Sequence, residues 1–336
     1  MRLLYVSRTS GVHDLRFTDA WRSSGLEVEA MTLGPEASPN AFLDRVAAFR
    51  PNVVQVGPIT APGPLVAAHW DGPMIASSWA FDLLLEAEQS AELRDAAVEV
   101  LRRADVTFVD SGAVRDRALE LGADPGGVIC FPWGISREWL GKAPDSRGEN
   151  GRFVFLSTRR HEPIYRVDDA ISAFGGVAHE MMGAELWIAG SGSLTSVLRD
   201  QVDRSGIADR VRFVGEQSGA ALRKLYQEAD VYVSCSIVDG TSISLLEAMA
   251  TGSLPVVSDI PGNREWVGDD TGSRYPVGDV DELRSRMLAS FRLPAGARDR
   301  MALRAFDLVR EAADWDLTTH RLPRYLETAM SRHEAA

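Results

Sequence analysis

Short apolar runs typical of buried β-strands alternate with amphipathic helical stretches along the whole 336-residue chain. This alternation restricts the fold more than any other feature, because strand–helix–strand connections build parallel sheets with helices on their faces. The pattern occurs twice. The expected strands of the first half are Arg2–Ser7, Leu26–Leu33, Asn52–Val56, Met74–Ser78, Val106–Asp110 and Gly127–Phe131. Those of the second half are Phe153–Ser157, Glu185–Ala189, Val211–Val214, Val231–Cys235 and Pro255–Ser258.

A charged stretch with two glycines and one proline, KAPDSRGENGR at residues 142–152, separates the two halves and has nothing to bury. We therefore expect an N-terminal Rossmann-like domain over residues 1–141, a linker over 142–152 and a C-terminal Rossmann-like domain over 153–316. Residues 317–336 predict a C-terminal helix that returns to the N-terminal domain. The expected fold class is α/β, with two facing doubly wound parallel-sheet domains and a cleft between them.

The charge balance excludes one large class of partner. Forty-eight acidic residues against thirty-six basic residues give a net charge of −12, whereas binding to nucleic acid needs a dense basic surface. Among the basic residues, only Lys142 and Lys224 are lysines. Any phosphate that a cation binds in this chain is therefore expected to meet arginine, which donates two parallel hydrogen bonds.

The two cysteines indicate a reducing compartment. Cys130 and Cys235 lie far apart in apolar runs and form neither a metal-ligand spacing nor a disulfide framework. Residues 1–7 are too short for the apolar core of a secretion signal, and no run reaches the roughly 20 apolar residues that span a bilayer. We expect a cytoplasmic protein without a transmembrane segment and without a metal.

The most informative stretch is VYVSCSIVDGTSISLLEAMATGSLPVVS, residues 231–258. A buried strand ends near Ser236, a short polar loop follows, and a helix is expected from about Ile243 to Thr251, where Gly252 stops it. The free backbone N–H groups at such a helix start form an anion site. The expected anion-binding residues are Gly240, Thr241, Ser242 and Ile243, with Asp239 beside them.

Glu247 lies four residues into this expected helix, about 6 Å along the axis at a rise of about 1.5 Å per residue. That offset resembles the distance between the pyrophosphate and the ribose hydroxyls of a nucleotide. In the alternative interpretation Ser244–Glu247 is a capping box and Asp239 is a solvated loop residue. The apolar neighbours of Glu247 favour a specific partner for its carboxylate.

The stretch D-G-T-S-I-S-L-L-E-A-M-A-T-G, residues 239–252, resembles the signature of glycosyltransferase family 4, retaining enzymes of the GT-B fold with two Rossmann-like domains. In that family two acidic residues eight positions apart flank a helix start. The resemblance implies that Glu247 binds the ribose of a nucleotide sugar and that Asp239 meets the transferred sugar. Asp239 stands where the family usually has glutamate, so its side chain is shorter.

The stretch FVFLSTRRHEPIYRVDDAISA, residues 153–173, resembles the strand, loop and helix start of the family in which an arginine and a lysine bind the pyrophosphate. Arg159 falls on the family arginine. Tyr165 falls on the family lysine and carries no charge at pH 7. Arg160 or Arg166 could supply the missing cation, although single arginines are more often surface charges.

Two further segments of the second half resemble donor-binding elements of the family. AGSGS places Gly192 and Ser193 in a turn that lets backbone approach the donor, and RVRFVG places Val214 beside the base. Arg264 and Glu265 match the family pattern after the next strand. The sequence Asp279–Asp281 has the D-x-D form of some metal sites, but it lies at a helix start and is interpreted as a cap.

The resemblance assigns the acceptor to the first half. Gly11, which matches one glycine of the family loop, is instead an expected donor-binding residue. His13 on the first helical turn is expected to be a neutral hydrogen-bonding group. Trp79 and Asp82 match a second acceptor strand, in which Asp82 could orient or deprotonate an acceptor hydroxyl and Trp79 could pack on a sugar or belong to the core. Arg16 and Trp133 complete the expected acceptor set, with Trp133 replacing a family asparagine.

Six acids and one arginine between Asp82 and Glu99 suggest a second property of the acceptor. Such a run is usually a solvated helix face, but it would also attract a cationic acceptor such as an aminocyclitol. The first half contains no G-x-G-x-x-G, which argues against a dinucleotide oxidoreductase.

The resemblance therefore implies a retaining, metal-independent hexosyltransferase. It would move a sugar from a nucleotide-diphosphate donor, a UDP-sugar by family frequency, to a hydroxyl of a small-molecule or saccharide acceptor. The expected catalytic residues are Asp239, Arg159, Asp82 and His13, and the nucleotide sugar is a co-substrate rather than a cofactor. Two alternatives remain at this point: a GT-B epimerase or phosphorylase, and a non-catalytic protein that binds nucleotide sugars.

Overall fold

The computed structural model of the chain describes residues 1–34, 37–141, 143–144 and 152–335. These residues form two compact units. The first unit consists of Met1–Pro132 together with Asp316–Ala336, and the second consists of Trp133–Trp315.

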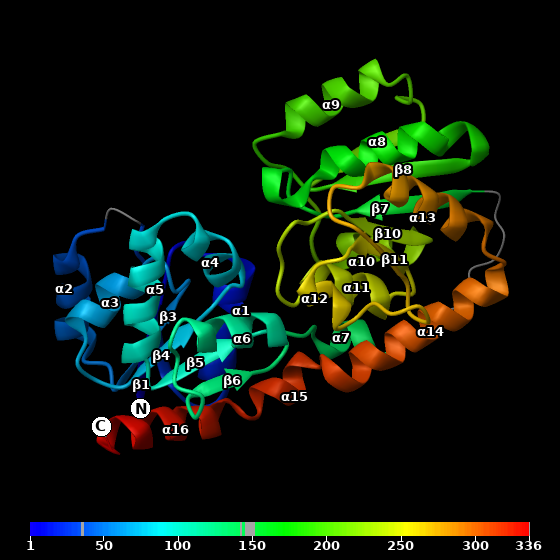
Figure 1. The fold of residues 1–336 in the computed structure, drawn as a ribbon. Coiled ribbons are helices and arrows are strands. Elements are labelled where there is room, and N and C mark those ends of the chain that lie inside the picture. Colours follow the sequence, from blue (N-terminus) through cyan, green and yellow to red (C-terminus); the bar gives the residue numbers. More distant parts are fainter. Residues whose placement is uncertain (35–36, 142, 145–151, 336) are drawn as a thin grey trace. The chain divides into compact units, whose positions relative to one another are not determined.

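The first unit is built on a six-stranded parallel sheet in the order β2-β1-β3-β4-β5-β6 (Figure 1). Its strands are β1 (Arg2–Ser7), β2 (Glu27–Thr32), β3 (Val53–Gly57), β4 (Met74–Ser77), β5 (Val106–Val109) and β6 (Val128–Cys130). Every residue of β3 and β4 is buried, as expected of parallel strands that helices cover on both faces.

The helices of the first unit follow from caps and apolar faces in the sequence. They are α1 (Val12–Ser23), α2 (Pro39–Phe49), α3 (Gly63–His69), α4 (Phe81–Leu84), α5 (Ala91–Arg103), α6 (Gly112–Glu120) and α16 (Leu322–Ala335). In α5, for example, the Ser90 hydroxyl accepts a hydrogen bond from the Leu93 N–H at 3.2 Å, and Ala97, Val100 and Leu101 form the buried face.

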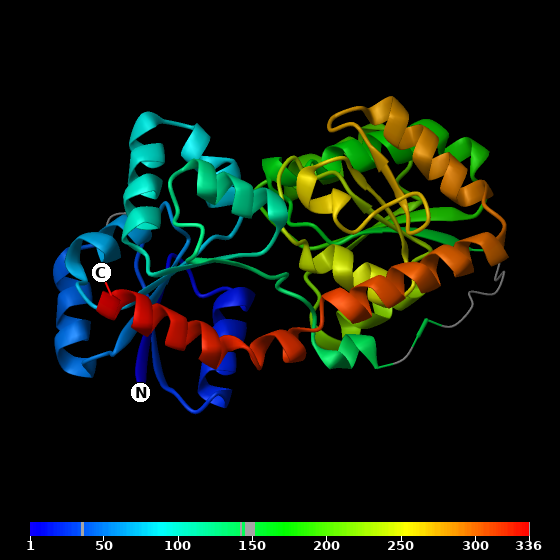
Figure 2. The same cartoon turned by 60° about the horizontal axis from the view of Figure 1, so that its bottom comes forward.

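The C-terminal helix α16 packs on the first unit, where Figure 2 shows it in red. The ring of Tyr325 lies 5.8 Å from that of Phe108 and 5.7 Å from that of Phe131. Arg332 Nε donates to the carbonyl oxygen of Asp105 at 2.8 Å. Aromatic packing and one partly buried hydrogen bond from a side chain to the backbone therefore hold this last segment to the sheet.

The second unit repeats the architecture with the strand order β12-β11-β10-β7-β8-β9. Its strands are β7 (Phe153–Ser157), β8 (Ala184–Ala189), β9 (Val211–Gly215), β10 (Val231–Ser234), β11 (Leu254–Ser258) and β12 (Ser273–Tyr275). Its helices are α7 (Arg137–Leu140), α8 (Val167–Val177), α9 (Thr195–Arg204), α10 (Gly219–Glu228), α11 (Ile243–Ala250), α12 (Pro261–Arg264), α13 (Val280–Arg292) and α14 (Ala295–Ala312). The short helix α15 (Trp315–Thr319) follows at the return to the first unit.

The predicted α/β class with two doubly wound parallel sheets is confirmed. Strand β12 is not among the predicted strands, because its three residues, Ser-Arg-Tyr, form no apolar run. The division of the chain also differs in detail. Residues 133–141 pack with the second unit rather than the first, because Ile135 and Leu140 belong to its core. Of the expected linker 142–152, residues 142 and 145–151 lie outside the described residues.

Both sheets have a point where the strand order reverses. In the first unit the reversal lies between β1 and β3, and in the second it lies between β7 and β10. Doubly wound proteins bind their ligands outside the carboxyl ends of the strands at such switch points. The loops after these four strands are therefore where a site is to be sought.

Candidate functional site

The switch point of the second unit carries an arginine and a carboxylate on its two sides. Arg159 follows β7, Asp239 follows β10, and α11 begins four residues after Asp239. The register between β7 and β10, in which Leu156 pairs with Tyr232, brings the ends of both strands together.

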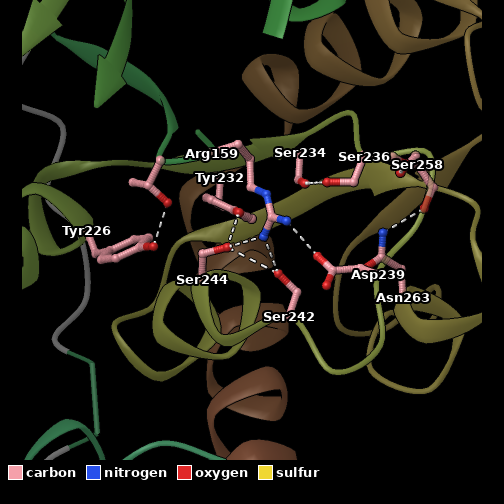
Figure 3. A network of polar contacts seen from close by, with 11 residues as sticks. Arg159, Tyr226, Tyr232, Ser234, Ser236, Asp239, Ser242, Ser244, Ser258 and Asn263 are labelled. Atoms are coloured by element: carbon pink, nitrogen blue, oxygen red, sulfur yellow. Dashed lines mark hydrogen bonds and ion pairs between the residues drawn. The ribbon is translucent and has the colours of Figure 1, made fainter. Parts of the chain in front are cut away.

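Arg159 is the centre of the polar network in Figure 3. Its Nη1 donates to Ser242 Oγ at 2.7 Å and to Ser244 Oγ at 2.8 Å, and its Nη2 donates to Asp239 Oδ2 at 2.7 Å. Only 9% of the side chain is exposed. Burial alone would lower the pKa of Arg159, but Asp239 outweighs it and holds that pKa above its usual value. The site therefore keeps a permanent positive charge at the helix start.

The ring of Tyr165 lies under this guanidinium, with Arg159 Cζ 4.2 Å from the ring centroid. Where the resembling family has a lysine, this chain supplies an aromatic face, which orients the neighbouring cation instead of adding a second one. Arg159 Nε is buried and has no hydrogen-bond partner among the described residues. The guanidinium is thus held on one face and along part of its edge, and its Nε–H is left unused.

The two nearby arginines do not extend the cationic site in this structure. Arg166, which has a positive φ of 44° at the N-cap of α8, donates from Nε and Nη2 to the two carboxylate oxygens of Asp169 at 2.6 and 2.9 Å. Arg160 is 75% exposed, and its nearest acid is Glu162 at 4.0 Å. The expectation that one of them supplies the missing cation therefore receives no support from their contacts.

The start of α11 excludes the capping-box interpretation. Ser242 is the N-cap and its side chain makes no capping hydrogen bond. Ser244 already belongs to the first turn, where its hydroxyl accepts from Arg159 and from Tyr232 Oη, the latter at 2.8 Å. The backbone N–H groups at this helix start are therefore not consumed by the N-cap side chain.

Glu247 lies one turn further along α11 and is partly exposed. The phenol of Tyr226 hydrogen-bonds with Glu247, and it also lies 2.7 Å from Thr158 Oγ1. Burial and the charge of Glu247 raise the pKa of Tyr226. The carboxylate is thus anchored on one side while part of it remains open to solvent.

The loop that carries Asp239 is supported by contacts that the sequence analysis missed. Ser258 Oγ donates to the Ser236 carbonyl oxygen at 2.6 Å, and Asn263 Nδ2 donates to that of Ser258 at 2.8 Å. The Ile237 N–H donates to the Ile164 carbonyl oxygen at 2.9 Å, which ties this loop to the Tyr165 turn. At Gly262 a Cβ would lie 2.2 Å from the Gly240 carbonyl oxygen, so only glycine fits there.

A signal for part of this support was present in the sequence. Tyr226 and Tyr232 are completely buried phenols, and a buried hydroxyl needs a polar partner. Tyr232 also interrupts the apolar strand β10 with a polar group, as Ser244 does in the apolar helix α11.

The other predicted donor residues lie at the carboxyl end of the same sheet. Glu162 accepts hydrogen bonds from the Ser193 N–H at 3.0 Å and the Ser193 hydroxyl at 2.6 Å. A Cβ at Gly192 would lie 2.5 Å from the His161 carbonyl oxygen, which explains the glycine in this turn. Val214, on β9, is partly buried against the apolar core.

In the first unit, Gly11, His13, Arg16 and Trp79 gather around the start of α1. Gly11 is the N-cap of α1. The imidazole of His13 lies 5.1 Å from the ring of Trp79, centroid to centroid. Burial, with a smaller effect of the nearby Arg16, lowers the pKa of His13 to about 4. His13 is therefore neutral at pH 7, and its direction of shift agrees with the sequence-based expectation.

Asp82 has a different environment from the one that the sequence suggested. It is completely buried, and its Oδ1 accepts from the Ser78 hydroxyl at 2.6 Å and from the N–H groups of Trp79 and Leu83 at 3.0 Å. Its Oδ2 accepts from the Ile59 N–H at 2.7 Å. Burial raises the pKa of Asp82 to about 6 despite these donors. A carboxylate in this state holds two loops together and does not reach an acceptor hydroxyl.

Two acids of the run that follows Asp82 form ion pairs within the first unit. Both oxygens of Glu86 bind Arg8, and Glu88 pairs with Arg94 at 2.6 Å and with Arg117. These pairs reduce the charge that the run presents, and attraction of a cationic acceptor stays a prediction. Trp133, a further expected acceptor residue, is only 2% exposed and belongs to the second unit.

Two smaller expectations concern metal and membrane. Asp279 is the N-cap of α13, and its Oδ1 accepts from the Glu282 N–H at 2.9 Å, which confirms the interpretation as a cap. Within the part of the chain that the structure describes, no helix is both long and apolar enough to cross a membrane.

A doubly wound unit in which an arginine and a helix start meet at the switch point is the arrangement by which such units bind phosphates. Residues 142–305 match the family model described as "Glycosyl transferases group 1". The second unit therefore matches the family of group 1 glycosyl transferases.

Comparison with curated proteins supports this assignment. Over 212 residues the chain is 29% identical to the phosphatidyl-myo-inositol mannosyltransferase of Mycobacterium leprae, an alignment that covers 62% of this chain and 54% of that protein. The chain thus spans about half the length of the first curated relatives it matches.

Solved structures share the fold over nearly the whole chain. The sucrose-phosphate synthase of Thermosynechococcus elongatus superimposes with a TM-score of 0.84 at 14% identity, covering 98% of this chain and 99% of that one. The HepE protein of Anabaena, solved in complex with UDP-glucose, gives a TM-score of 0.80 at 16% identity and covers 98% of this chain and 100% of that one. The fold of both units is therefore the GT-B fold of known glycosyltransferases.

Proposed function

We propose that this protein transfers a sugar from a nucleoside-diphosphate donor, a UDP-sugar in the first instance, to a hydroxyl of a small-molecule or saccharide acceptor. One observation carries the proposal. A buried, permanently charged arginine meets an uncapped helix start at the switch point of a group 1 glycosyl transferase unit.

The donor would bind along the carboxyl edge of the second sheet. Arg159 and the N–H groups of residues 241–243 would hold the diphosphate, because both offer donors to an anion from a site already shielded from water. Glu247, one turn into α11, would accept the ribose hydroxyls. Ser193 and Val214 would lie toward the base, and Asp239 toward the sugar.

The same groups would serve the chemical step. When the bond between the sugar and the distal phosphate breaks, negative charge builds on the leaving diphosphate. Arg159 is fixed by Tyr165, Ser242 and Ser244 before the donor arrives, so its charge needs no reorganisation to stabilise the leaving group. We propose that transfer proceeds without a metal ion, retains the anomeric configuration and passes the acceptor proton to the leaving phosphate.

The first unit would bind the acceptor. His13, neutral at pH 7, offers a ring nitrogen as a hydrogen-bonding group, and Trp79 offers an aromatic face suited to a sugar ring. Asp82 has no part in this proposal, because all its contacts are structural.

The choice of uridine as the base rests on a structural relative. HepE of Anabaena has been solved with UDP-glucose and shares the fold over nearly the full length of this chain. The experiment is a thermal-shift screen of the full chain against UDP, GDP and TDP, followed by incubation with the sugar form of the best ligand and product analysis in EDTA. A ligand at 100 times its Kd adds about 2.7 kcal/mol of stability, which is readily measured.

We expect stabilisation by UDP, and slow donor hydrolysis or sugar transfer that continues in EDTA and that Arg159→Ala abolishes. Absence of stabilisation by every nucleoside diphosphate would contradict the proposal. Binding without any release of UDP from the donor would instead support the non-catalytic alternative. Donor isomerisation or phosphorolysis would support an epimerase or a phosphorylase.

A further inference from the structure

We propose that Asp239 competes with the donor diphosphate for Arg159, so that the ion pair seen in this structure must open when the nucleotide binds and closes again when it leaves. This inference rests on the proposed function and deepens it. It assigns to Asp239 a role in setting the affinity for the nucleotide, in addition to its expected contact with the sugar.

The protein itself already occupies most of the N–H donors that Arg159 could offer to a diphosphate. Both N–H groups of Nη1 are used by the hydroxyls of Ser242 and Ser244, and one of the two N–H groups of Nη2 is used by Asp239. With 9% of its side chain exposed, Arg159 offers a ligand only a narrow edge. Of the three hydrogen-bonding partners, only Asp239 carries a charge, so it is the one that an incoming anion opposes and can replace.

The two sides of the pair differ in freedom. Arg159 is fixed by the ring of Tyr165 and by two serines, whereas Asp239 is 22% exposed at the edge of a loop and makes its ion pair with Arg159 through one oxygen, Oδ2. Opening the pair therefore moves the carboxylate toward solvent and leaves the guanidinium in place. The unused, buried Nε–H of Arg159 indicates that its donors are not yet all satisfied without a ligand.

The exchange gives a physical reason for release of the product. While the donor is intact, the sugar offers hydroxyl groups to Asp239 in place of Arg159. After transfer these hydroxyls have left. The carboxylate and the diphosphate, both negatively charged, then compete for the same guanidinium. Its return to Arg159 then lowers the affinity for the nucleoside diphosphate.

The test compares UDP with uridine as ligands of the full chain, by isothermal titration calorimetry. Uridine contains the base and ribose but lacks the diphosphate. We expect Asp239→Asn to tighten UDP binding by about fivefold, the value of a typical partly exposed ion pair, and to leave uridine binding unchanged within about twofold. Circular dichroism and the Tm of the variant verify that it folds.

The matched control is Asp259→Asn. Asp259 follows β11 in the same unit and binds Arg264 at 2.9 Å and Arg274 at 2.8 Å, so its substitution removes the same charge without touching Arg159. We expect no change in UDP affinity for this variant. In an Arg159→Gln background, Asp239→Asn should likewise lose its effect, because the competition needs the arginine.

The inference is overturned if Asp239→Asn leaves UDP affinity unchanged or weakens it, or if Asp259→Asn or the Arg159→Gln background shows the same tightening. The proposed function fails in a different way, namely if the unmodified protein binds neither UDP nor another nucleoside diphosphate.

Discussion

In each unit an arginine just after the first strand pairs with a carboxylate, but the donors of the two arginines are satisfied differently. In the first unit Arg8 follows β1, and its Nη1 and Nη2 donate to the two oxygens of Glu86 at 2.7 and 2.8 Å. Its Nη2 also donates to Thr60 Oγ1, and its Nε donates to the Ala61 carbonyl oxygen, both at 3.1 Å. In the second unit Arg159 binds one carboxylate oxygen and two serines, and its Nε has no partner among the described residues.

The starts of α1 and α11 differ in the same way, since the protein satisfies the first more fully than the second. In the first unit, Asp14 Oδ2 accepts from the Gly11 N–H at 2.7 Å and so fills the start of α1 with the protein's own anion. In the second unit, the N-cap Ser242 leaves the first N–H groups of α11 without a side-chain cap. Under the proposed function, position in the fold alone does not make a phosphate site. The donors there must also be left unsatisfied by the protein.

The largest expected effect is on UDP affinity, and it tests the difference between the two arginines directly. Arg159→Ala should weaken UDP binding by about a hundredfold or more, because it removes charge-assisted hydrogen bonds to the diphosphate. Arg8→Ala should change UDP affinity by less than about twofold, because its donors are already satisfied. Calorimetric titration of both variants measures this, and equal losses would show that the two switch points are not different in function.

The second prediction concerns the free energy of unfolding, to which we expect Arg8 to contribute. Arg8→Ala leaves Glu86 without its main partner at a site that is about four-fifths buried, so it should lower the free energy of unfolding by about 2 kcal/mol. The exposed pair of Arg45 and Glu29 is the control, and Arg45→Ala should cost less than about 0.5 kcal/mol. Urea denaturation measures both values. Equal stability of the two variants would refute the structural role of Arg8.

The third prediction concerns the ribose. Glu247→Gln should weaken UDP binding by about tenfold, because a carboxylate offers an accepting oxygen to each ribose hydroxyl, whereas an amide has one accepting oxygen and a donating NH2 group. A nucleotide without these hydroxyls, 2′,3′-dideoxy-UDP, should bind the variant and the unmodified protein alike. Unequal affinities for the dideoxy nucleotide would mean that Glu247 acts through the fold or through charge instead.

The smallest expected effect is the pH dependence of stability that His13 and Asp82 give to the first unit. The folded pKa of His13, about 4, lies below its ordinary value of 6.5. Between these values the unfolded chain takes up a proton that the folded chain does not, so this group lowers stability as the pH falls from 6.5 to 4. Asp82 acts oppositely, because its folded pKa of about 6 lies above 3.8, and folding binds a proton in that window.

NMR titration of the histidines tests this assignment, with His13→Gln identifying the resonance. We expect a midpoint near 4 for His13, and a stability loss below pH 6.5 that is shallower in the variant. A midpoint near 6.5 would remove His13 as a neutral group of the acceptor region.

The sequence allowed the fold to be predicted and the segment that we propose to bind the donor to be located, because both are encoded locally. Buried strands are continuous apolar runs, and the helix start with Asp239 and Glu247 lies in a single short stretch. The short edge strand β12 has no such run, which is why it was missed.

The remaining features depend on contacts between distant segments. Arg8 and Glu86 are 78 residues apart, and no local pattern pairs them. Asp82 carries the charge of a catalytic acid, but its burial depends on the loop at Ile59. Tyr165 matches a family position with the wrong residue type, and only the structure shows that its ring faces Arg159. Residue type predicts what a side chain can do, whereas its partners decide whether it remains available to a ligand.

The most direct test of the account is the crystal structure of the protein with UDP. The account predicts the diphosphate at the start of α11, with Arg159 Nη2 bonded to a phosphate oxygen and no longer 2.7 Å from Asp239 Oδ2, while Arg8 keeps both bonds to Glu86. UDP bound elsewhere, or bound with the pair of Arg159 and Asp239 intact, would contradict it.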